Sequence, residues 1–144
     1  MKALTISQPY ASLIASGEKW IENRHWTTQY RGPLAIHAGK GNQYMDTREM
    51  AAMPTGCVIA IAELVGCLPL DILRKHRSSQ VLDKLGVSVD EFLANVHAEG
   101  PWCWVLQGAR RIKPIAARGQ QGIWTFYPPN EGVVYEVNQP GERE

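Results

Sequence analysis

The sequence has few cysteines, few histidines and no long apolar run, and each shortage excludes a class of protein. Three cysteines are present, an odd number, and none of them forms a Cys-x-x-Cys pair. We therefore expect free thiols in a reducing, cytoplasmic location rather than a disulfide framework for Cys57, Cys67 and Cys103. The four histidines are scattered along the chain, so neither a metal site nor any other cofactor is expected.

We also expect neither an export signal nor a membrane span. The apolar start of the chain, Met1 to Ile6, runs directly into Ser7, Gln8 and Pro9, and is too short and too polar for a signal core. No apolar run approaches the roughly 20 residues that a membrane-spanning helix needs. We therefore expect no membrane partner.

Charge is balanced in total but not along the chain. Fifteen Lys and Arg stand against fourteen Asp and Glu, and the net charge of +1 excludes a histone-like basic surface. Residues 23–45 and 100–130 contain no acid, and their cations are Arg24, Arg31, Lys40, Arg110, Arg111, Lys113 and Arg118. If these two stretches lie side by side, they form one basic face. The alternative is two unrelated solvated segments.

A chain of 144 residues with 44% hydrophobic and 20% charged residues is typical of one globular domain. Apolar runs bounded by Gly and Pro predict strands over residues 3–6, 19–23, 34–38, 57–66, 102–107, 109–112 and 123–126, with 133–137 as a further option. Helices are predicted over residues 9–16, 71–85 and 88–97. The absence of a β-α-β-α rhythm excludes a Rossmann sheet. The fold class expected is α+β, a small, mostly antiparallel β-barrel with peripheral helices.

Local residues indicate where the predicted helices begin and end. Ser7 is placed to cap the first helix, and Gly17 is placed to end it. The same helix is expected to bury one face formed by Tyr10, Leu13 and Ile14. Ser88, followed three residues later by Glu91, has the form of a capping box.

The densest polar segment of the sequence contains Lys19, Glu22 and Arg24. On a strand, Glu22 and Arg24 lie on the same face because alternate side chains share a face. A partly buried pair of this kind orients a ligand-binding arginine by a charge-assisted hydrogen bond. An exposed pair is a surface ion pair worth less than about 1 kcal/mol. Lys19, beside a carboxylate, can activate a nucleophile if it is buried, and the sequence leaves these alternatives open.

Residues 25–33 combine aromatic, hydroxyl and basic side chains, a mixture that stacks on bases and binds phosphates. The candidates in this loop are Trp26, Tyr30 and Arg31, although a solvated loop with one aromatic side chain in the core has the same composition. Tryptophans on predicted strands are more typical of a core, and this applies to Trp102, Trp104 and Trp124. His37, in an apolar strand, is typical of a hydrogen-bonded core histidine, with a general base as the alternative.

Several of these segments resemble the ASCH domain family, named after the C-terminal domain of a transcription coactivator. The resemblance spans roughly residues 2–126 and is carried by Gln8-Pro9-Tyr10-Ala11-Ser12-Leu13, Gly17-x-Lys19-x-x-Glu22-x-Arg24 and Tyr30-Arg31-Gly32-Pro33-Leu34-x-Ile36-His37-Ala38-x-Lys40. It implies a PUA-like β-barrel with a cleft beside the first helix, and similar PUA domains bind RNA. By position, the resemblance assigns to this cleft or its rim Gln8, Lys19, Glu22, Arg24, Arg31 and Lys40.

The first function implied is binding of RNA or single-stranded nucleic acid, or of a modified nucleoside. The domain would span residues 1–127, with residues 128–144 as an acidic tail that contains Pro and Gly, and the protein would be a monomer or weak dimer. Arg24, Arg31 and Lys40 would meet phosphates or base edges, while Trp26 or Tyr30 would stack on a base.

The alternative function is a small hydrolase. Some bacterial members of the family release acyl groups from N4-acylated cytidines with a Lys, a Thr and a Glu, and ribonuclease activity is reported for others. Lys19 resembles the family lysine and would be the catalytic base with Glu22 beside it. Glu22 stands where those hydrolases have the threonine, which is a departure from their pattern.

Overall fold

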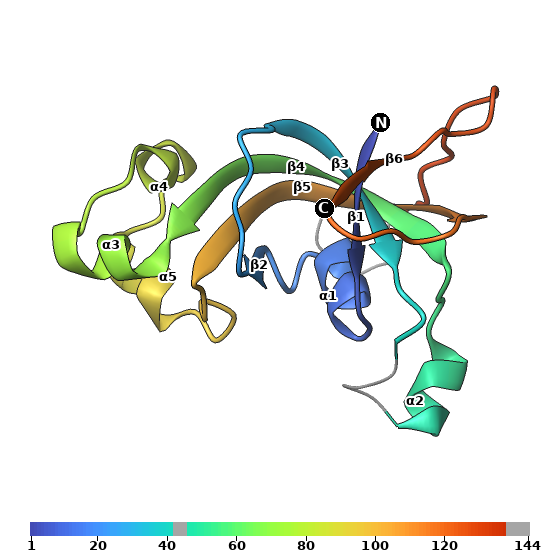
Figure 1. The fold of residues 1–144 in the computed structure, drawn as a ribbon, viewed down its shortest axis with the longest axis horizontal. Coiled ribbons are helices and arrows are strands. Elements are labelled where there is room, and N and C mark those ends of the chain that lie inside the picture. The colour runs from blue at the N-terminus through green and yellow to red at the C-terminus, as the bar shows by residue number, and fades with distance from the viewer. Residues whose placement is uncertain (42–45, 138–144) are drawn as a thin grey trace. The chain divides into compact units, whose positions relative to one another are not determined.

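The chain folds into strands and short helices in a computed structural model, which describes residues 1–41 and 46–137 (Figure 1). The elements in chain order are β1 (Lys2–Ile6), α1 (Tyr10–Ser16), β2 (Ile21–Arg24), β3 (Gly32–Ala38), α2 (Thr47–Ala52), β4 (Cys57–Pro69), α3 (Leu70–His76), α4 (Gln80–Leu85), α5 (Val89–Ala94), β5 (Trp102–Ala116) and β6 (Ile123–Thr125). Among the described residues, no helix has the length and apolar character to cross a membrane.

The strands are hydrogen-bonded in the order β2-β5-β4-β3-β1-β6. β1 pairs parallel with β3 and antiparallel with β6, while β2 pairs antiparallel with β5. The α+β class is therefore confirmed, and the sheet is mixed. The described chain divides into two compact units, which we call unit 1 (residues 1–19, 33–63 and 108–144) and unit 2 (residues 20–32 and 64–107).

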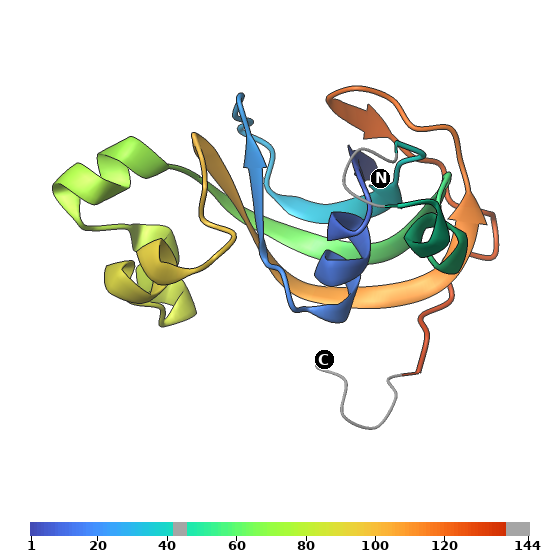
Figure 2. The same ribbon diagram turned by 90° about the horizontal axis from the view of Figure 1, so that it is seen from below.

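The core of unit 1 is formed by strands from its three segments of chain. Ala3 of β1 lies opposite Ala35 of β3 and Trp124 of β6, so three distant segments meet at one point. The buried cluster around them consists of Ala3, Ala35, Val58, Ile61, Ile112, Trp124 and Phe126. Figure 2 shows α1 in front of the strands of this unit.

The start of α1 differs from the sequence-based expectation. Pro9, not Ser7, occupies the N-cap position, and no side chain caps it. The end is as predicted, because Gly17 adopts a left-handed conformation with φ 84° and its N–H donates to Ile14 O. The buried face was predicted wrongly in part, since the helix buries Ala11, Ile14 and Ala15. Tyr10 and Leu13 are only half-buried.

Unit 2 packs three short helices into one core. The buried side chains of this core include Phe92, Leu82, Leu70 and Ile21, and Trp20 meets Phe92 edge-on with ring centres 5.7 Å apart. The single helix predicted over residues 71–85 is wrong: Arg77 adopts a left-handed conformation with φ 56°, which ends α3.

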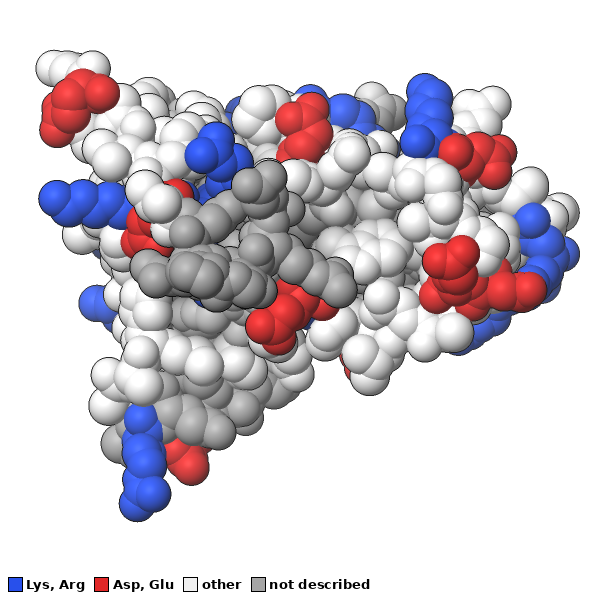
Figure 3. All heavy atoms as spheres, turned by 180° about the vertical axis from the view of Figure 1, so that it is seen from behind, with Lys and Arg blue, Asp and Glu red and all other residues white. Residues whose placement is uncertain are grey.

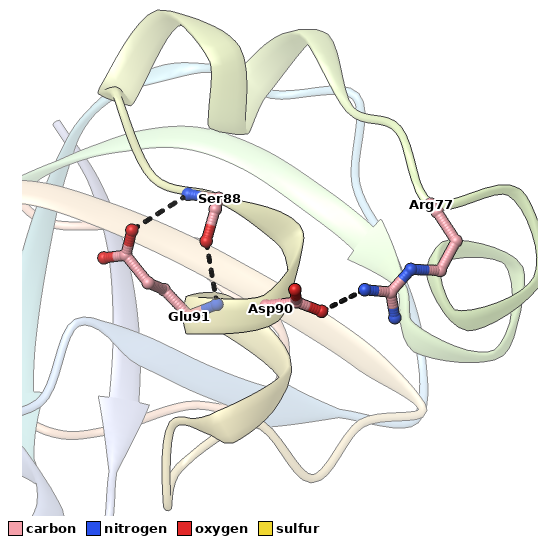
Figure 4. A network of polar contacts seen from close by, with 4 residues as sticks. All are labelled: Arg77, Ser88, Asp90 and Glu91. Carbon is pink, nitrogen blue, oxygen red and sulfur yellow. Dashed lines mark hydrogen bonds and ion pairs between the residues drawn. The ribbon is translucent and has the colours of Figure 1, made fainter.

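The capping box at the start of α5 is confirmed. Ser88 Oγ accepts from the Glu91 N–H at 3.0 Å, and the Ser88 N–H donates to Glu91 Oε1 at 3.5 Å (Figure 4). Arg77 pairs with Asp90 in the same view. Because both of these side chains are exposed, this ion pair contributes little to stability.

Two further predictions are corrected. β5 is one strand through Gly108, which has φ 62° but makes no turn, so the two strands predicted on either side of it are continuous. The optional strand over residues 133–137 is reduced to one bridge between Ile112 and Tyr135. The helix α2 was not predicted. The division into a domain of residues 1–127 and a tail of residues 128–144 stays a prediction, and residues 138–144 lie outside the described residues.

Cys57, Cys67 and Cys103 are buried and free, so the expectation of unpaired thiols is confirmed. Burial raises the pKa of the Cys57 thiol, and the thiolate is the reactive form.

We predict that a thiol reagent reacts with native protein at pH 8 much more slowly than with glutathione. The denatured protein should release all three thiols, and Cys57→Ser should release one fewer. An intact mass showing the loss of two hydrogens under non-reducing conditions would contradict this.

Candidate functional site

Lys19 is a buried lysine in unit 1. The whole residue is 3% exposed, and its backbone N–H, just after the turn at Gly17, donates to Leu13 O at 3.0 Å. The ammonium nitrogen Nζ lies 5.6 Å from the centre of the Tyr10 ring, a cation–π contact. Lys19 is therefore not a solvated surface residue, which excludes a role in solubility alone.

Glu22 and Arg24 form the ion pair that their spacing on a strand predicts. Glu22 Oε2 lies 2.9 Å from Arg24 Nη2, with the two side chains 11% and 23% exposed. Both residues are on β2, where they pair with Trp104 and Trp102 of β5. A hydrogen bond from a guanidinium to a carboxylate is charge-assisted. Because this one is also largely removed from water, it orients the Arg24 guanidinium.

The side-chain amide of Gln8 forms hydrogen bonds within unit 1. Its Nε2 donates to Ser12 Oγ at 2.8 Å and to Pro54 O at 2.9 Å, while its Oε1 accepts from the Ser12 N–H at 2.9 Å. The residue is fully buried. Gln8 therefore substitutes for the missing side-chain cap of α1 and ties the helix to residue 54, which makes it a positioning residue.

The loop of residues 25–31 is held in unit 2 by its aromatic side chain and its arginine. The Trp26 ring meets Trp104 edge-on with centres 4.7 Å apart, and Trp104 Nε1 donates to Trp26 O at 3.1 Å. Arg31 is exposed, and its Nη1 donates to Thr28 O and Tyr30 O, both at 2.7 Å. Trp26 is thus the aromatic anchor that the sequence left as an alternative, whereas Tyr30 is half-buried and Arg31 faces solvent.

A pocket of about 1020 Å³ opens in unit 1. Its lining combines three glycines with polar and basic side chains, and consists of Thr5, His37, Gly39, Lys40, Gly56, Ala116, Ala117, Arg118, Gly119, Gln120 and Gln121. Lys40 comes from the first acid-free stretch and Arg118 from the second. No Asp or Glu is among these described lining residues, so the pocket is positively charged.

The position of Lys40 depends on Gly56. Gly56 has φ 69°, and a Cβ built on it would lie 2.5 Å from Lys40 Cε. The Lys40 stem therefore crosses the bare backbone of Gly56 while its ammonium group remains exposed. Any other residue at position 56 would be strained and would displace this lysine.

His37 lies inside the same pocket and is 2% exposed. Its Nε2 is 2.7 Å from Ala117 O, so Nε2 carries a proton and donates, because a carbonyl oxygen only accepts. The histidine is therefore the hydrogen-bonded core residue that the sequence favoured. Its second ring nitrogen, Nδ1, is buried and has no hydrogen-bond partner within the described part of the chain.

Two cations of the second acid-free stretch, Arg110 and Arg111, are not among the residues that line the pocket with Lys40 and Arg118. Along β5, Arg110 stacks on the Tyr135 ring at 4.3 Å from its centre. Arg111 instead lines a separate cavity of about 230 Å³ together with Glu136. Alternation along a strand separates these neighbours. On the face shown in Figure 3, outside the grey atoms, basic side chains likewise stand apart among acidic and uncharged ones.

Sequence reasoning included Lys40 but missed the other pocket residues as a site. The sequence indicates Arg118 only as a member of an acid-free stretch, and His37 as a core histidine with a general base as the alternative. The cluster of Gly119 and Gly122 after a strand was the available signal, because glycines let a ligand approach the backbone. Within residues 1–41 and 46–137, no group of three His, Cys, Asp or Glu side chains is placed to hold a metal ion.

We predict that Gln8→Met lowers the free energy of unfolding by about 2–4 kcal/mol, because the Ser12 N–H and the Pro54 carbonyl lose their partner. The measurement is urea unfolding at neutral pH. Gln29→Met, at an exposed position, is the matched control and should change little. A stable Gln8→Met protein would show that Gln8 is not the residue that positions α1.

The sequence matches the ASCH domain family over residues 4–116. Activating signal cointegrator 1 of Mus musculus is 33% identical over 81 residues, and that of Homo sapiens is 32% identical. Each match covers 45% of this chain and only 14% of the relative, so the chain spans a small part of these proteins.

Solved structures show the same fold. The crystal structure of ASCH from Zymomonas mobilis aligns with a TM-score of 0.53 and 16% identity, covering 88% of this chain and 87% of that one. A point mutant of the same protein aligns with a TM-score of 0.52 and 16% identity, covering 88% and 89%. The PUA-like α+β fold class is therefore confirmed. The family match spans well over half of the sequence, and the chain belongs to the ASCH domain family.

Proposed function

We propose that this chain is a nucleic-acid-binding module that holds a nucleotide of RNA or single-stranded nucleic acid in the unit 1 pocket. The main support for this proposal is that Lys40 and Arg118 both line a pocket whose described lining residues include no carboxylate. Both side chains are exposed and can follow a phosphate. On a protein of net charge +1, such a local basic opening is what attracts a polyanion.

Other pocket groups suit the same ligand. Gln120 and Gln121 are exposed side chains that carry both donors and acceptors, the combination that reads base edges. Gly39, Gly56 and Gly119 leave backbone accessible in the pocket lining. Single-stranded nucleic acid fits this arrangement because its bases are free to leave the stack and enter a pocket.

Unit 2, considered by itself, also carries groups that suit nucleic acid. Glu22 orients the Arg24 guanidinium, and the Arg31 head is exposed, so both arginines suit phosphates or base edges. Trp26 and Tyr30 are half-buried and offer ring edges or faces for stacking. Lys19 and Gln8 are buried in unit 1, so we assign them to shaping the site rather than to long-range attraction.

We predict that Lys40→Gln/Arg118→Gln weakens binding of a fluorescent eight-nucleotide RNA and makes it less salt-dependent. Each phosphate contact on a single strand adds about 0.7 to the slope of log affinity against log salt, so losing two contacts should lower the slope by about 1.4. Fluorescence anisotropy over a salt series measures both quantities.

The matched control is Arg74→Gln/Lys84→Gln, which removes the same two charge types from exposed helix positions in unit 2. Its slope should equal that of the parent protein. An unchanged slope in the pocket variant would show that RNA does not bind at this pocket. If the parent protein does not bind RNA, the proposed function is wrong.

A small hydrolase of N4-acylated cytidines, or a ribonuclease, is the second candidate, and the burial of Lys19 favours it. Buried lysines are the kind that serve as general bases in enzymes, and Lys19 is 3% exposed. Glu22 is buried as well, although it replaces the threonine of the known hydrolases.

We expect no product when the protein is incubated with N4-acetylcytidine or with the same RNA and followed by mass spectrometry. Turnover of either substrate would favour the hydrolase, and Lys19→Arg would then decide the role of Lys19. Arginine keeps the positive charge but does not release its proton near neutral pH. Turnover lost with RNA affinity retained in Lys19→Arg would identify Lys19 as the base.

A further inference from the structure

We propose that His37 reads the base in the unit 1 pocket, with its Nδ1 accepting a hydrogen bond from an N–H of a nucleobase whose phosphate lies at Lys40 and Arg118. This inference rests on the proposed function, because it assigns the ligand of the same pocket. It goes further by naming a nucleotide with a base N–H donor as the ligand and a buried acceptor as the specificity-determining group.

The hydrogen bonds of His37 determine the character of Nδ1. Nε2 donates to Ala117 O at 2.7 Å, so in the neutral ring Nδ1 carries a lone pair and accepts. Nδ1 is buried without a hydrogen-bond partner in the described chain, although buried polar atoms nearly always have one. A ligand donor would supply that partner.

The histidine ring is held in a fixed orientation before any ligand arrives. The Trp124 ring stands edge-on to it at 5.4 Å between centres, and Trp124 Nε1 donates to Thr5 Oγ1 at 3.0 Å. Thr5 is the residue paired with His37 across the parallel β1–β3 ladder. The direction in which Nδ1 accepts is therefore preorganised by three elements of unit 1.

Gly119 packs closely against the His37 ring beside the buried Nδ1. A Cβ at Gly119 would lie 2.9 Å from His37 Cε1, 3.0 Å from Thr5 Oγ1 and 3.1 Å from His37 Nδ1. Gly119 is not among the glycines with positive φ, so its backbone conformation does not demand glycine. Glycine is needed here because a side chain does not fit beside the acceptor without displacing a neighbour.

The positions of the acceptor and the cations in the pocket suit a nucleotide better than a free anion. The acceptor is buried, whereas the two cations are exposed, so a base would lie inward and a phosphate outward. A lone pair repels phosphate oxygens, which makes Nδ1 unsuited to phosphate itself. A volume of about 1020 Å³ accommodates a nucleotide, since small-ligand pockets occupy about 300–1,000 Å³.

The test compares two substitutions at His37, one that keeps the donor at Nε2 and one that keeps an acceptor at Nδ1. The His37→Gln side chain reaches the position of Nε2 and keeps a donor for Ala117 O, but it removes the acceptor at Nδ1. The His37→Asn side chain places its amide near Nδ1 and can keep an acceptor there. The probes are the four nucleoside 5′-monophosphates, 3-methyluridine 5′-monophosphate and ribose 5-phosphate, titrated by calorimetry.

We expect at least one nucleotide to bind the parent about tenfold more tightly than ribose 5-phosphate does, the value of one hydrogen bond to a buried acceptor. His37→Gln should bind that nucleotide no better than ribose 5-phosphate, and His37→Asn should retain part of the preference. If uridine monophosphate is bound, its 3-methyl derivative should lose the preference, because the methyl group replaces the base N–H.

A spectroscopic readout keeps the inference independent of how well the variants fold. In ¹⁵N-histidine-labelled parent protein, the His37 Nδ1 resonance should move upfield on saturation with the nucleotide and stay unchanged with ribose 5-phosphate. Gly119→Ala, which keeps the imidazole but places a methyl group against Cε1 and Nδ1, should abolish the nucleotide preference.

Equal affinity for nucleotides and ribose 5-phosphate, or an Nδ1 resonance that does not move, would overturn the inference. RNA binding with its salt slope intact would then leave the proposed function standing. Failure of the parent to bind RNA at all would overturn the proposed function instead.

Discussion

The parallel pairing of β1 with β3 determines where the polar groups of the unit 1 pocket lie. Thr5 is opposite His37 and Ile6 is opposite Ala38, and the Gly39 N–H extends this ladder by donating to Ile6 O at 2.9 Å. A slip of one residue would turn His37 to the other face of the strand, because side chains alternate. The register thus sets the position of the only polar side chain in an otherwise apolar buried run, residues 34–38.

Backbone hydrogen bonds carry this register to the other walls of the pocket. The Gly56 N–H donates to Ala38 O at 2.7 Å, and the Ala117 N–H donates to Gly56 O at 3.1 Å. Ala117 O then accepts from His37 Nε2. Segments far apart in sequence are therefore joined in a closed chain of hydrogen bonds, and the cations on two of them, Lys40 and Arg118, meet at the same opening. Their closeness results from backbone pairing, since nothing attracts two like charges to each other.

Sequence patterns predicted the features whose physical cause is local. The Gly17 cap, the Ser88–Glu91 capping box and the Glu22–Arg24 pair each depend on residues within three positions of one another. The central strand β4 was also found, from its β-branched apolar run. The break at Arg77 was missed because its left-handed conformation is uncommon for a non-glycine residue. The pocket was missed because its walls are joined only by long-range strand pairing, which periodicity does not reveal.

The buried polar residues of the family motif have a different physical role from the exposed cations. Gln8 holds the start of α1 with three hydrogen bonds, and Lys19 is packed under that helix against Tyr10. Such residues act through the geometry that they impose, because a buried group has little influence on a ligand in solution before contact. Lys40 and Arg118 are exposed, so they attract a polyanion at a distance but distinguish poorly between ligands. Discrimination requires a fixed, desolvated group, and within unit 1 the buried Nδ1 of His37 has that character.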